Sequence, residues 1–212
     1  MPKILLVDDH AIVRSGLKLL IEDFISHSVI EEAQDGDSAF EKIKKNDYDL
    51  IIMDVNMPNT DSFGILDTIF TIKPAVKIIM FSMNAEEIYA KKFLKMGAMG
   101  YVQKDVPGNE IKKAISTVLN GKKYISEELR EKFLNDLQVN NNSANPFDAL
   151  SLRELEIVRY LIQGDSVGEI SQKLKLHTST VGTYKSRIFE KLQCNNIIEL
   201  SQLSKIHNLT FN

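Results

Sequence analysis

Short apolar segments alternate with segments of helical periodicity through the first 122 residues, and this alternation constrains the fold more than any other feature. The strand-like segments are apolar and partly β-branched: Lys3 to Val7, Ser28 to Ala33, Asp49 to Met53, Val76 to Phe81 and Gly100 to Gln103. Between them, apolar residues recur at helical spacing. Parallel strands need helical crossovers, and these cover both faces of the sheet. The pattern therefore predicts an α/β domain, with a five-stranded, doubly wound parallel sheet.

The rest of the chain has a different character. Ser126 to Leu137 has the pattern of a charged helix, and the segment Val139 to Asn145 reads VNNNSAN before Pro146. So polar a segment has too little apolar content to order itself, which predicts a linker. Helical periodicity without strand signals resumes at Leu150. We therefore expect a first domain at 1–122, a helical segment and flexible linker at 123–147, and a small all-α domain at 148–212.

Composition excludes several classes of protein. The chain has 26 Lys and Arg against 29 Asp and Glu, a formal net charge of −3, so any affinity for nucleic acid must be local. Cys194 is the only cysteine, which excludes an internal disulfide and a cysteine zinc cluster. No apolar run approaches the ~18–20 residues of a membrane span, and the N-terminus is too acidic for a signal peptide. These features predict a cytoplasmic protein with no membrane partner.

Charged and polar residues stand at the ends of the predicted strands. Asp8 and Asp9 follow the first strand, Asp54 the third, Ser82 the fourth and Lys104 the fifth. Ligands of such folds bind beyond the carboxyl ends of the strands, so these side chains should share one rim. Several carboxylates in one open crevice suit a hard cation that keeps water ligands, such as Mg²⁺.

This arrangement of side chains suits phosphoryl transfer. Asp54 could attack a phosphoryl donor as a carboxylate nucleophile. The metal and Lys104 would neutralise the phosphoryl oxygens, and the Ser82 hydroxyl could donate to one of them. Taken singly, Asp8 or Asp9 could be a helix cap and Lys104 a surface lysine. These separate explanations would require all five residues to fall on the same rim of the sheet by chance.

Four motifs strengthen this hypothesis: V-D-D-H at 7–10, M-D-V-N-M-P at 53–58, F-S at 81–82 and G-A-M-G-Y-V-Q-K-D at 97–105. They closely resemble the receiver domain of two-component response regulators, which has a flavodoxin-like fold. The resemblance implies that Asp54 is the phospho-acceptor. It implies direct Mg²⁺ ligation by Asp9, Asp54 and the backbone carbonyl of Asn56, with Asp8 acting mostly through water. It also implies that Ser82 and Tyr101 are paired switch residues, with the tyrosine ring moving inward behind the hydroxyl.

The C-terminal part carries a second pattern. Ser151 and Glu154 form a capping-box pattern before an apolar face, and Gly164 should end that helix. A short helix from Ser166 to Leu174, a turn and a longer helix from Ser179 to Leu192 follow. This is helix-turn-helix geometry, which places its second helix in the major groove of DNA. The outward-facing candidates for DNA contact are Thr178, Thr180, Thr183, Tyr184, Lys185, Arg187 and Lys191.

Sequence motifs again point to a family. L-S-x-R-E-x-E at 150–156, G-D-S-V-G-E-I-S-Q-K-L at 164–174, T-V at 180–181 and K-S-R-I-F-E-K-L at 185–192 look like the DNA-binding domain of NarL/FixJ-type, or LuxR-type, regulators. The resemblance implies a recognition helix that starts near Thr180. It also implies a dimer contact through the last helix, about Asn196 to His207.

These features together predict a transcriptional regulator that a sensor histidine kinase phosphorylates on Asp54. Phosphorylation would release or reorient the helical domain and favour a homodimer on double-stranded DNA. The first domain would catalyse only its own phosphorylation and dephosphorylation, so the protein is not expected to be an enzyme.

Two alternatives remain open. Gly182, Tyr184 and Ile197 stand where the family often has cationic residues, so the protein could be a phosphorylation-dependent protein-interaction module whose tail has lost DNA affinity. The acidic crevice could also belong to a hydrolytic metalloenzyme. That alternative is the weaker one, because no histidine or second general base is evident near the carboxylates.

Overall fold

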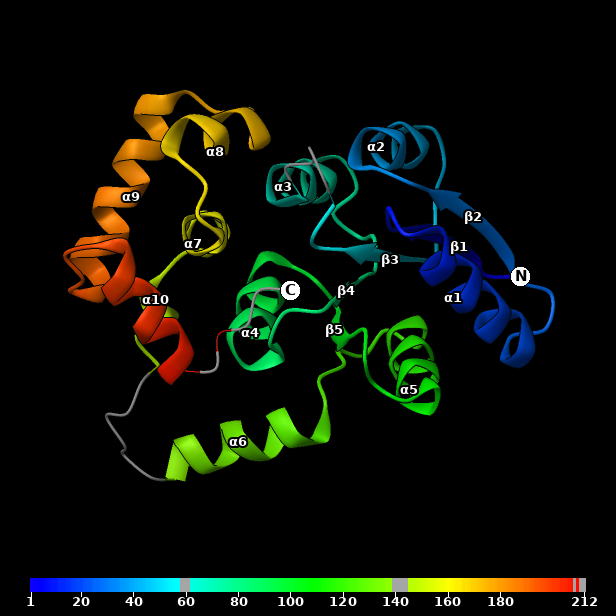
Figure 1. Cartoon of the computed structure of the whole chain (residues 1–212). Helices are drawn as coiled ribbons and strands as arrows, with labels where there is room; N and C mark the ends of the chain where they lie inside the picture. The colour runs from blue at the N-terminus through cyan, green and yellow to red at the C-terminus, as the bar shows by residue number, and fades with distance from the viewer. Residues whose placement is uncertain (58–61, 139–144, 208, 210–212) are drawn as a thin grey trace.

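A computed structural model describes residues 1–57, 62–138, 145–207 and 209 (Figure 1). The predicted linker residues 139–144 and Pro58 of the motif at 53–58 lie outside the described residues. Two parts are visible, an α/β domain and a helical domain joined through a long helix.

The N-terminal domain contains a five-stranded parallel sheet in the order β2-β1-β3-β4-β5. Its strands are β1 (Lys3–Val7), β2 (Val29–Ala33), β3 (Leu50–Asp54), β4 (Ile78–Ser82) and β5 (Gly100–Gln103). All five predicted strands are present, each within two residues of its predicted start. Because all strands are parallel, the carboxyl ends of β1, β3, β4 and β5 lie along one edge of the sheet. The strand order reverses beside β1, where such folds bind their ligands.

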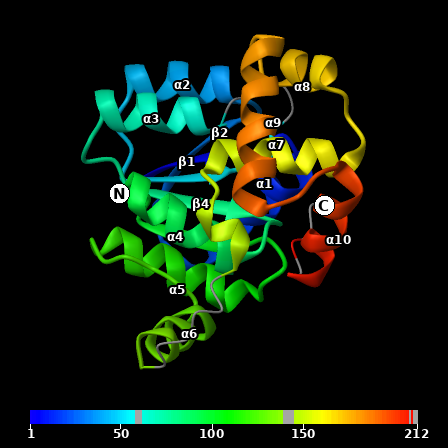
Figure 2. The ribbon, with the colours of Figure 1, turned by 90° about the vertical axis from the view of Figure 1, so that its left-hand side faces the viewer.

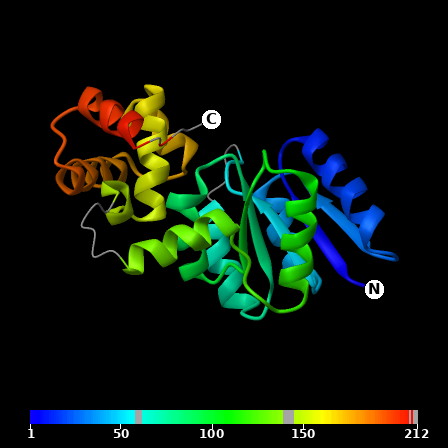
Figure 3. The same ribbon diagram turned by 90° about the horizontal axis from the view of Figure 1, so that it is seen from below.

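Helices cover both faces of this sheet (Figures 1 and 3). They are α1 (Ala11–Phe24), α2 (Gly36–Lys45), α3 (Ser62–Ile72), α4 (Glu86–Met96) and α5 (Gly108–Leu119). Ile4 and Leu6 pack in one core with residues of α1 and α5, whereas Leu5 and Val7 pack in the other with residues of α2, α3 and α4. Alternate residues of one strand thus serve opposite cores, which explains why the inner strands β1, β3 and β4 carry continuous apolar runs, whereas the edge strand β2 carries two glutamates. The predicted fold class is confirmed.

The helical domain follows α6 (Glu127–Gln138) and contains a helix-turn-helix. Its elements are the 3₁₀ helix η1 (Pro146–Ala149), α7 (Leu152–Gln163), α8 (Val167–Lys173), α9 (Thr178–Leu192) and α10 (Ile197–Ile206). The capping box of Ser151 and Glu154 begins α7, and Gly164 ends it with a left-handed φ of 94°. Among the described residues, no helix combines the length and apolar content that crossing a bilayer requires.

The folded part of the helical domain begins before the boundary predicted from the sequence. Residues 145–147 were expected in the linker, but Asn145 caps η1 through its side chain, and Phe147 is fully buried in the helical domain. The Phe147 ring lies edge-on to His207, with centroids 6.2 Å apart. A lone aromatic residue beside a polar segment carries no periodic signal, which is why the pattern missed this anchor.

The two domains contact each other through η1, through α7 and through the turn before α9, where Lys175 pairs with Asp37 of α2 at 3.9 Å. The ammonium of Lys92 on α4 donates to the carbonyl of Asp148 at 2.9 Å and also to that of Leu150. Helix α9 packs against α7 and α8 and lies on the side of α7 away from the sheet (Figures 1 and 2). The proposed recognition helix is therefore not the element that faces the N-terminal domain.

Candidate functional site

A buried ion-pair network occupies the rim of the sheet. The Asp8 and Asp54 side chains are each 2% exposed, at the ends of β1 and β3. Lys104, which follows β5, places its Nζ 2.6 Å from Asp8 Oδ2 and 3.0 Å from Asp54 Oδ2. Three residues from separate predicted strand ends thus meet within hydrogen-bonding distance.

The site is electrostatically constrained. Burial raises the pKa of the Asp54 carboxyl, and the Lys104 ammonium with the Asn56 N–H only partly offsets that effect. Burial opposes the charge on Lys104, but the carboxylates of Asp54 and Asp8 outweigh it and raise the pKa of Lys104. Lys104 therefore stays protonated and holds a positive charge beside the carboxylate oxygens of Asp54.

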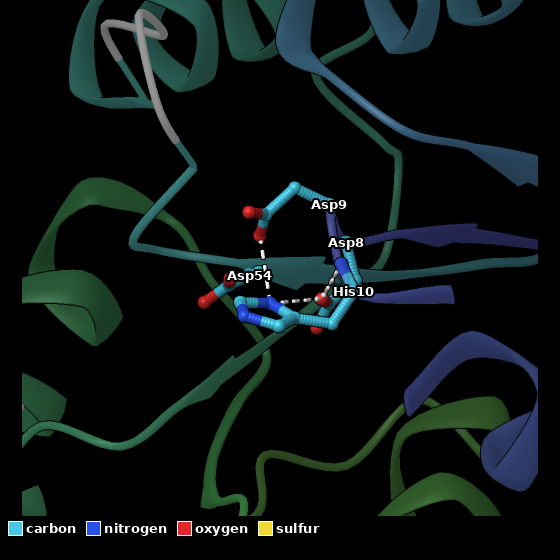
Figure 4. A group of neighbouring side chains, drawn as sticks. All are labelled: Asp8, Asp9, His10 and Asp54. Carbon is cyan, nitrogen blue, oxygen red and sulfur yellow. Dashed lines mark hydrogen bonds and ion pairs between the residues drawn. The ribbon is translucent and has the colours of Figure 1, made fainter. Parts of the chain in front are cut away.

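The donor set fits a hard divalent cation. Asp8, Asp9, His10 and Asp54 each offer a ligand atom within 4.8 Å of the others (Figure 4). Asp9 Oδ1 is buried, and the contact it makes among the described residues is with the His10 imidazole, whose Nδ1 lies 2.9 Å away. Clustered carboxylates beside such an oxygen suit Mg²⁺. Asn56 lies beside Asp54, because its N–H donates to Asp54 Oδ1 at 3.0 Å; metal ligation by its carbonyl stays a prediction.

His10 is a neighbour of the carboxylates, although no histidine was expected near them from the sequence. Its Nδ1 lies 2.9 Å from Asp9 Oδ1 and 3.3 Å from Asp8 Oδ1 (Figure 4). The statement that no histidine stands near the carboxylates was therefore wrong. His10 directly follows Asp9 in the sequence, and this adjacency could have predicted the contact. The imidazole is 64% exposed at the mouth of the site, so it does not form part of the buried network.

Ser82 and Tyr101 lie on the adjacent strands β4 and β5. Ser82 is fully buried, and its Oγ accepts the N–H of Asn84 at 3.1 Å. Tyr101 is also fully buried, and its hydroxyl donates to the Asn84 carbonyl at 2.8 Å. Its ring stacks on Phe93 of α4 with centroids 6.0 Å apart. The tyrosine thus already occupies an inward position, linked to Ser82 through Asn84.

Helix α9 presents a polar face away from α7. Thr178, Thr183 and Arg187 are exposed, whereas Thr180, Tyr184 and Lys185 are partly buried. Tyr184 packs against the apolar core, and the Lys185 ammonium lies 5.5 Å from the centre of the Phe189 ring. Of the predicted contacts, Thr178, Thr183, Arg187 and Lys191 are therefore the exposed ones.

Lys191 has a partner inside the domain. Its Nζ donates to both carboxylate oxygens of Glu154, at 2.9 and 2.7 Å. The Glu154 side chain is 4% exposed, and Glu154 is also the capping-box residue of α7. The end of α9 is thus ion-paired to the start of α7.

Comparison with known proteins identifies both domains. Residues 4–116 match the model of the response regulator receiver domain, and residues 148–204 match that of the bacterial regulatory proteins of the luxR family. The chain is a response regulator with a LuxR-type DNA-binding domain. The family is one of transcription regulators.

Relatives cover the whole chain. The response regulator UvrY of Escherichia coli K12 is 34% identical over 209 residues, which are 99% of this chain and 96% of UvrY. The response regulator GacA of Pseudomonas syringae pv. syringae is 33% identical, over 99% of this chain and 98% of GacA. RcsB of Salmonella enterica serovar Typhimurium, bound to promoter rprA with phosphomimetic BeF₃⁻, has a TM-score of 0.75 at 24% identity. That comparison covers 97% of this chain and 99% of RcsB and supports the two-domain fold.

Proposed function

We propose that this response regulator accepts a phosphoryl group on Asp54 and that phosphorylation controls DNA binding through α9. The observation that carries the proposal is the position of the Lys104 ammonium, within 3.0 Å of both Asp8 and Asp54 at the rim of the sheet. An ammonium held there can neutralise a phosphoryl oxygen as well as a carboxylate.

The proposed step is an in-line displacement at phosphorus. A carboxylate oxygen of Asp54 forms the new bond to phosphorus, while the bond to the leaving group of the donor breaks and that group keeps the electron pair. The product is an acyl phosphate. Lys104 would face the oxygens of the transferred phosphoryl group. The Asn56 N–H holds Oδ1 of Asp54, the carboxylate oxygen that does not attack, in position.

Asp8, Asp9, Asp54 and the carbonyl of Asn56 would hold Mg²⁺. When bound there, the ion would supply positive charge that stabilises the phosphoryl oxygens. Without a cation, the three carboxylates face one ammonium, and burial disfavours the charged form of Asp54. The proposal therefore predicts that phosphorylation of Asp54 requires the divalent ion.

Ser82 and Tyr101 would report phosphorylation to the helical domain. The Ser82 hydroxyl would turn from the Asn84 N–H to a phosphoryl oxygen, and the Asn84 carbonyl holds the hydroxyl of Tyr101. Phosphate favours the inward tyrosine only if it binds that arrangement better than the alternative. Tyr101 packs on α4, and α4 contacts η1 and its C-cap residue Leu150 through Lys92.

The proposed partners follow from the phosphorylation site and from the exposed faces of α9 and α10. A sensor histidine kinase would supply the phosphoryl group, and α9 would enter the major groove with Thr178, Thr183 and Arg187 outward. Two exposed apolar side chains of α10, Ile198 at 71% and Ile206 at 72%, suit a homodimer contact. Since the proposed target is chromosomal DNA, we place the protein in the cytoplasm.

Intact-mass analysis tests the phosphorylation step. The purified protein is incubated with Mg²⁺ and acetyl phosphate, and the modified residue is located by peptide mapping after borohydride reduction. We expect one phosphoryl group on Asp54, none in Asp54→Asn, and full modification in Asp105→Asn, whose parent residue is exposed and outside the ion-pair network. Modification of Asp54→Asn at the parental rate would refute Asp54 as the acceptor.

A further inference from the structure

The DNA-binding domain contributes a side chain to the edge of the proposed phosphorylation site. Arg159 lies on α7, and its Nη1 donates to the side-chain oxygen of Asn56, 103 residues away in sequence. Its Nη2 donates to the Tyr160 hydroxyl at 2.8 Å, and the guanidinium lies over the Tyr160 ring at 4.6 Å. These two contacts orient the planar guanidinium toward Asn56.

Asn56 connects this arginine to the acceptor carboxylate. Its backbone N–H donates to Asp54 Oδ1 at 3.0 Å, whereas its side-chain oxygen accepts from Arg159 and from Asn84 Nδ2 at 3.3 Å. Hydrogen bonds therefore connect Arg159 to Asp54 through one intervening residue, Asn56. The amide of Asn56 is held from two sides, by the helical domain and by the loop after β4.

The environment of Arg159 distinguishes this contact from a solvated surface pair. Arg159 and Glu156 line a small cavity between the domains together with Val55, Asn56, Asn84 and Tyr89. Arg159 Nε is buried there without a hydrogen-bond acceptor among the described residues. A buried donor without an acceptor costs free energy of folding, and the other hydrogen bonds of the guanidinium must offset this cost. Those bonds therefore determine where the guanidinium lies. The strongest of these is a charge-assisted bond to the loop that follows Asp54.

We propose that Arg159 is a positioning residue for the phosphorylation site, which fixes the loop at Asn56, whose carbonyl would be a ligand of the metal. This proposal rests on the function proposed above. Docking of α7 would then strengthen Mg²⁺ binding and phosphorylation of Asp54. Coupling between two sites is reciprocal, so occupancy of the metal site should also strengthen docking of α7.

Mg²⁺ binding by the full-length protein, measured calorimetrically, tests the proposal directly. Arg159→Ala should weaken Mg²⁺ binding by about threefold to tenfold, because a charge-assisted hydrogen bond carries about tenfold or more and only part of it reaches the metal through Asn56. The rate of Asp54 phosphorylation at subsaturating Mg²⁺ should fall by the same factor, and saturating Mg²⁺ should restore it. Arg159→Lys should keep part of the effect. Arg130→Ala is the matched control, since Arg130 is 53% exposed on α6 and pairs with Glu127.

A double-mutant cycle separates a positioning role from a general structural one. If Arg159 acts through the Asn56 side chain, Arg159→Ala should change Mg²⁺ affinity little in an Asn56→Ala background. Lys92→Met loosens the same interface at a different point, because Lys92 contacts Asp148 and Leu150 but not Asn56. It should have a smaller effect than Arg159→Ala, and far-UV circular dichroism should confirm that each variant is folded.

The outcomes are distinguishable. Equal or tighter Mg²⁺ binding by Arg159→Ala would overturn the role of Arg159. Mg²⁺ binding without phosphorylation of the parent would overturn the proposed function, while the effect of Arg159→Ala on metal affinity would still decide the role of Arg159. A parent protein that binds no Mg²⁺ would overturn both.

Discussion

Lys191→Met is the substitution whose effect differs most between the sequence interpretation and the structure. The sequence predicts a DNA contact, so the substitution should weaken DNA binding and leave the fold intact. In the structure, the ammonium donates to both oxygens of Glu154, whose side chain is 4% exposed. Removing the ammonium leaves a buried carboxylate without its counter-charge.

The size of this effect can be worked out from the contacts. Breaking a buried ion pair by removing one partner costs roughly 3–5 kcal/mol. Lys191 is itself 39% exposed, and the Ser151 N–H still donates to Glu154 at 2.7 Å, so we expect a smaller loss. About 2 kcal/mol of the free energy of unfolding of the helical domain should be lost. For a domain this small, that is a large share of its stability.

Urea unfolding followed by far-UV circular dichroism measures the loss. Lys205→Met is the matched control, because Lys205 is an exposed lysine on α10, and it should change stability by less than about 0.5 kcal/mol. A Lys191→Met/Glu154→Gln double variant should recover part of the loss, since the buried charge is then absent.

The pH dependence provides a second check. Burial opposes ionisation of Glu154, but the bonds from Lys191 and Ser151 outweigh it and hold its pKa below the ordinary 4.5. A carboxyl with a lowered pKa stabilises the fold above its unfolded-state value, and that contribution is lost as pH falls through the folded-state pKa. The cost of Lys191→Met should therefore be full at pH 7 and shrink below pH 4.5. If Lys191→Met unfolds like Lys205→Met yet loses DNA affinity, the ion-pair argument is refuted.

Three further predictions concern separate parts of the chain. Lys104→Met should slow phosphorylation of Asp54 by about a hundredfold, because it removes the donor that faces the transferred oxygens; a rate within threefold of the parent in a phosphodonor time course would contradict this role. Gly182→Ala should stabilise the helical domain by about 0.5–1 kcal/mol, since a Cβ at Gly182 meets nothing within 4 Å and helical glycine is entropically costly; a lower urea midpoint would show the space to be needed. Glu31→Gln should cost about 1 kcal/mol at pH 7, discounted for solvent screening of a side chain 29% exposed. The bond from Lys3 lowers the pKa of Glu31 to about 2, with help from Tyr48 and Lys42, so this contribution is present above pH 4.5 and fades toward pH 2; a pH-independent difference in unfolding free energy would count against it.

The sequence predicted features with a local or periodic signature. Strand ends were predictable because apolar runs stop where a carboxylate or lysine begins, and parallel topology then brings Asp8, Asp54 and Lys104 to one rim. The capping box of Ser151 and Glu154 was predictable because it spans four residues.

Contacts between distant segments were not predictable in this way. Arg159 resembles any arginine on an amphipathic helix until the fold places it beside Asn56. Lys191 has the spacing of an outward-facing residue, yet its long side chain reaches back to Glu154 on α7. Periodicity predicts which face of a helix is apolar, but not which partner a long polar side chain will find.

The central claim is that phosphorylation of Asp54 controls DNA binding, and selection of genomic DNA fragments by the purified protein tests it most directly. The parent and Asp54→Asn are compared with Mg²⁺, each with and without beryllofluoride. The account predicts that the parent enriches fragments sharing a repeated sequence, more strongly with beryllofluoride, and that Asp54→Asn shows no such increase. Enrichment that beryllofluoride leaves unchanged in the parent, or no enrichment in any condition, would contradict it.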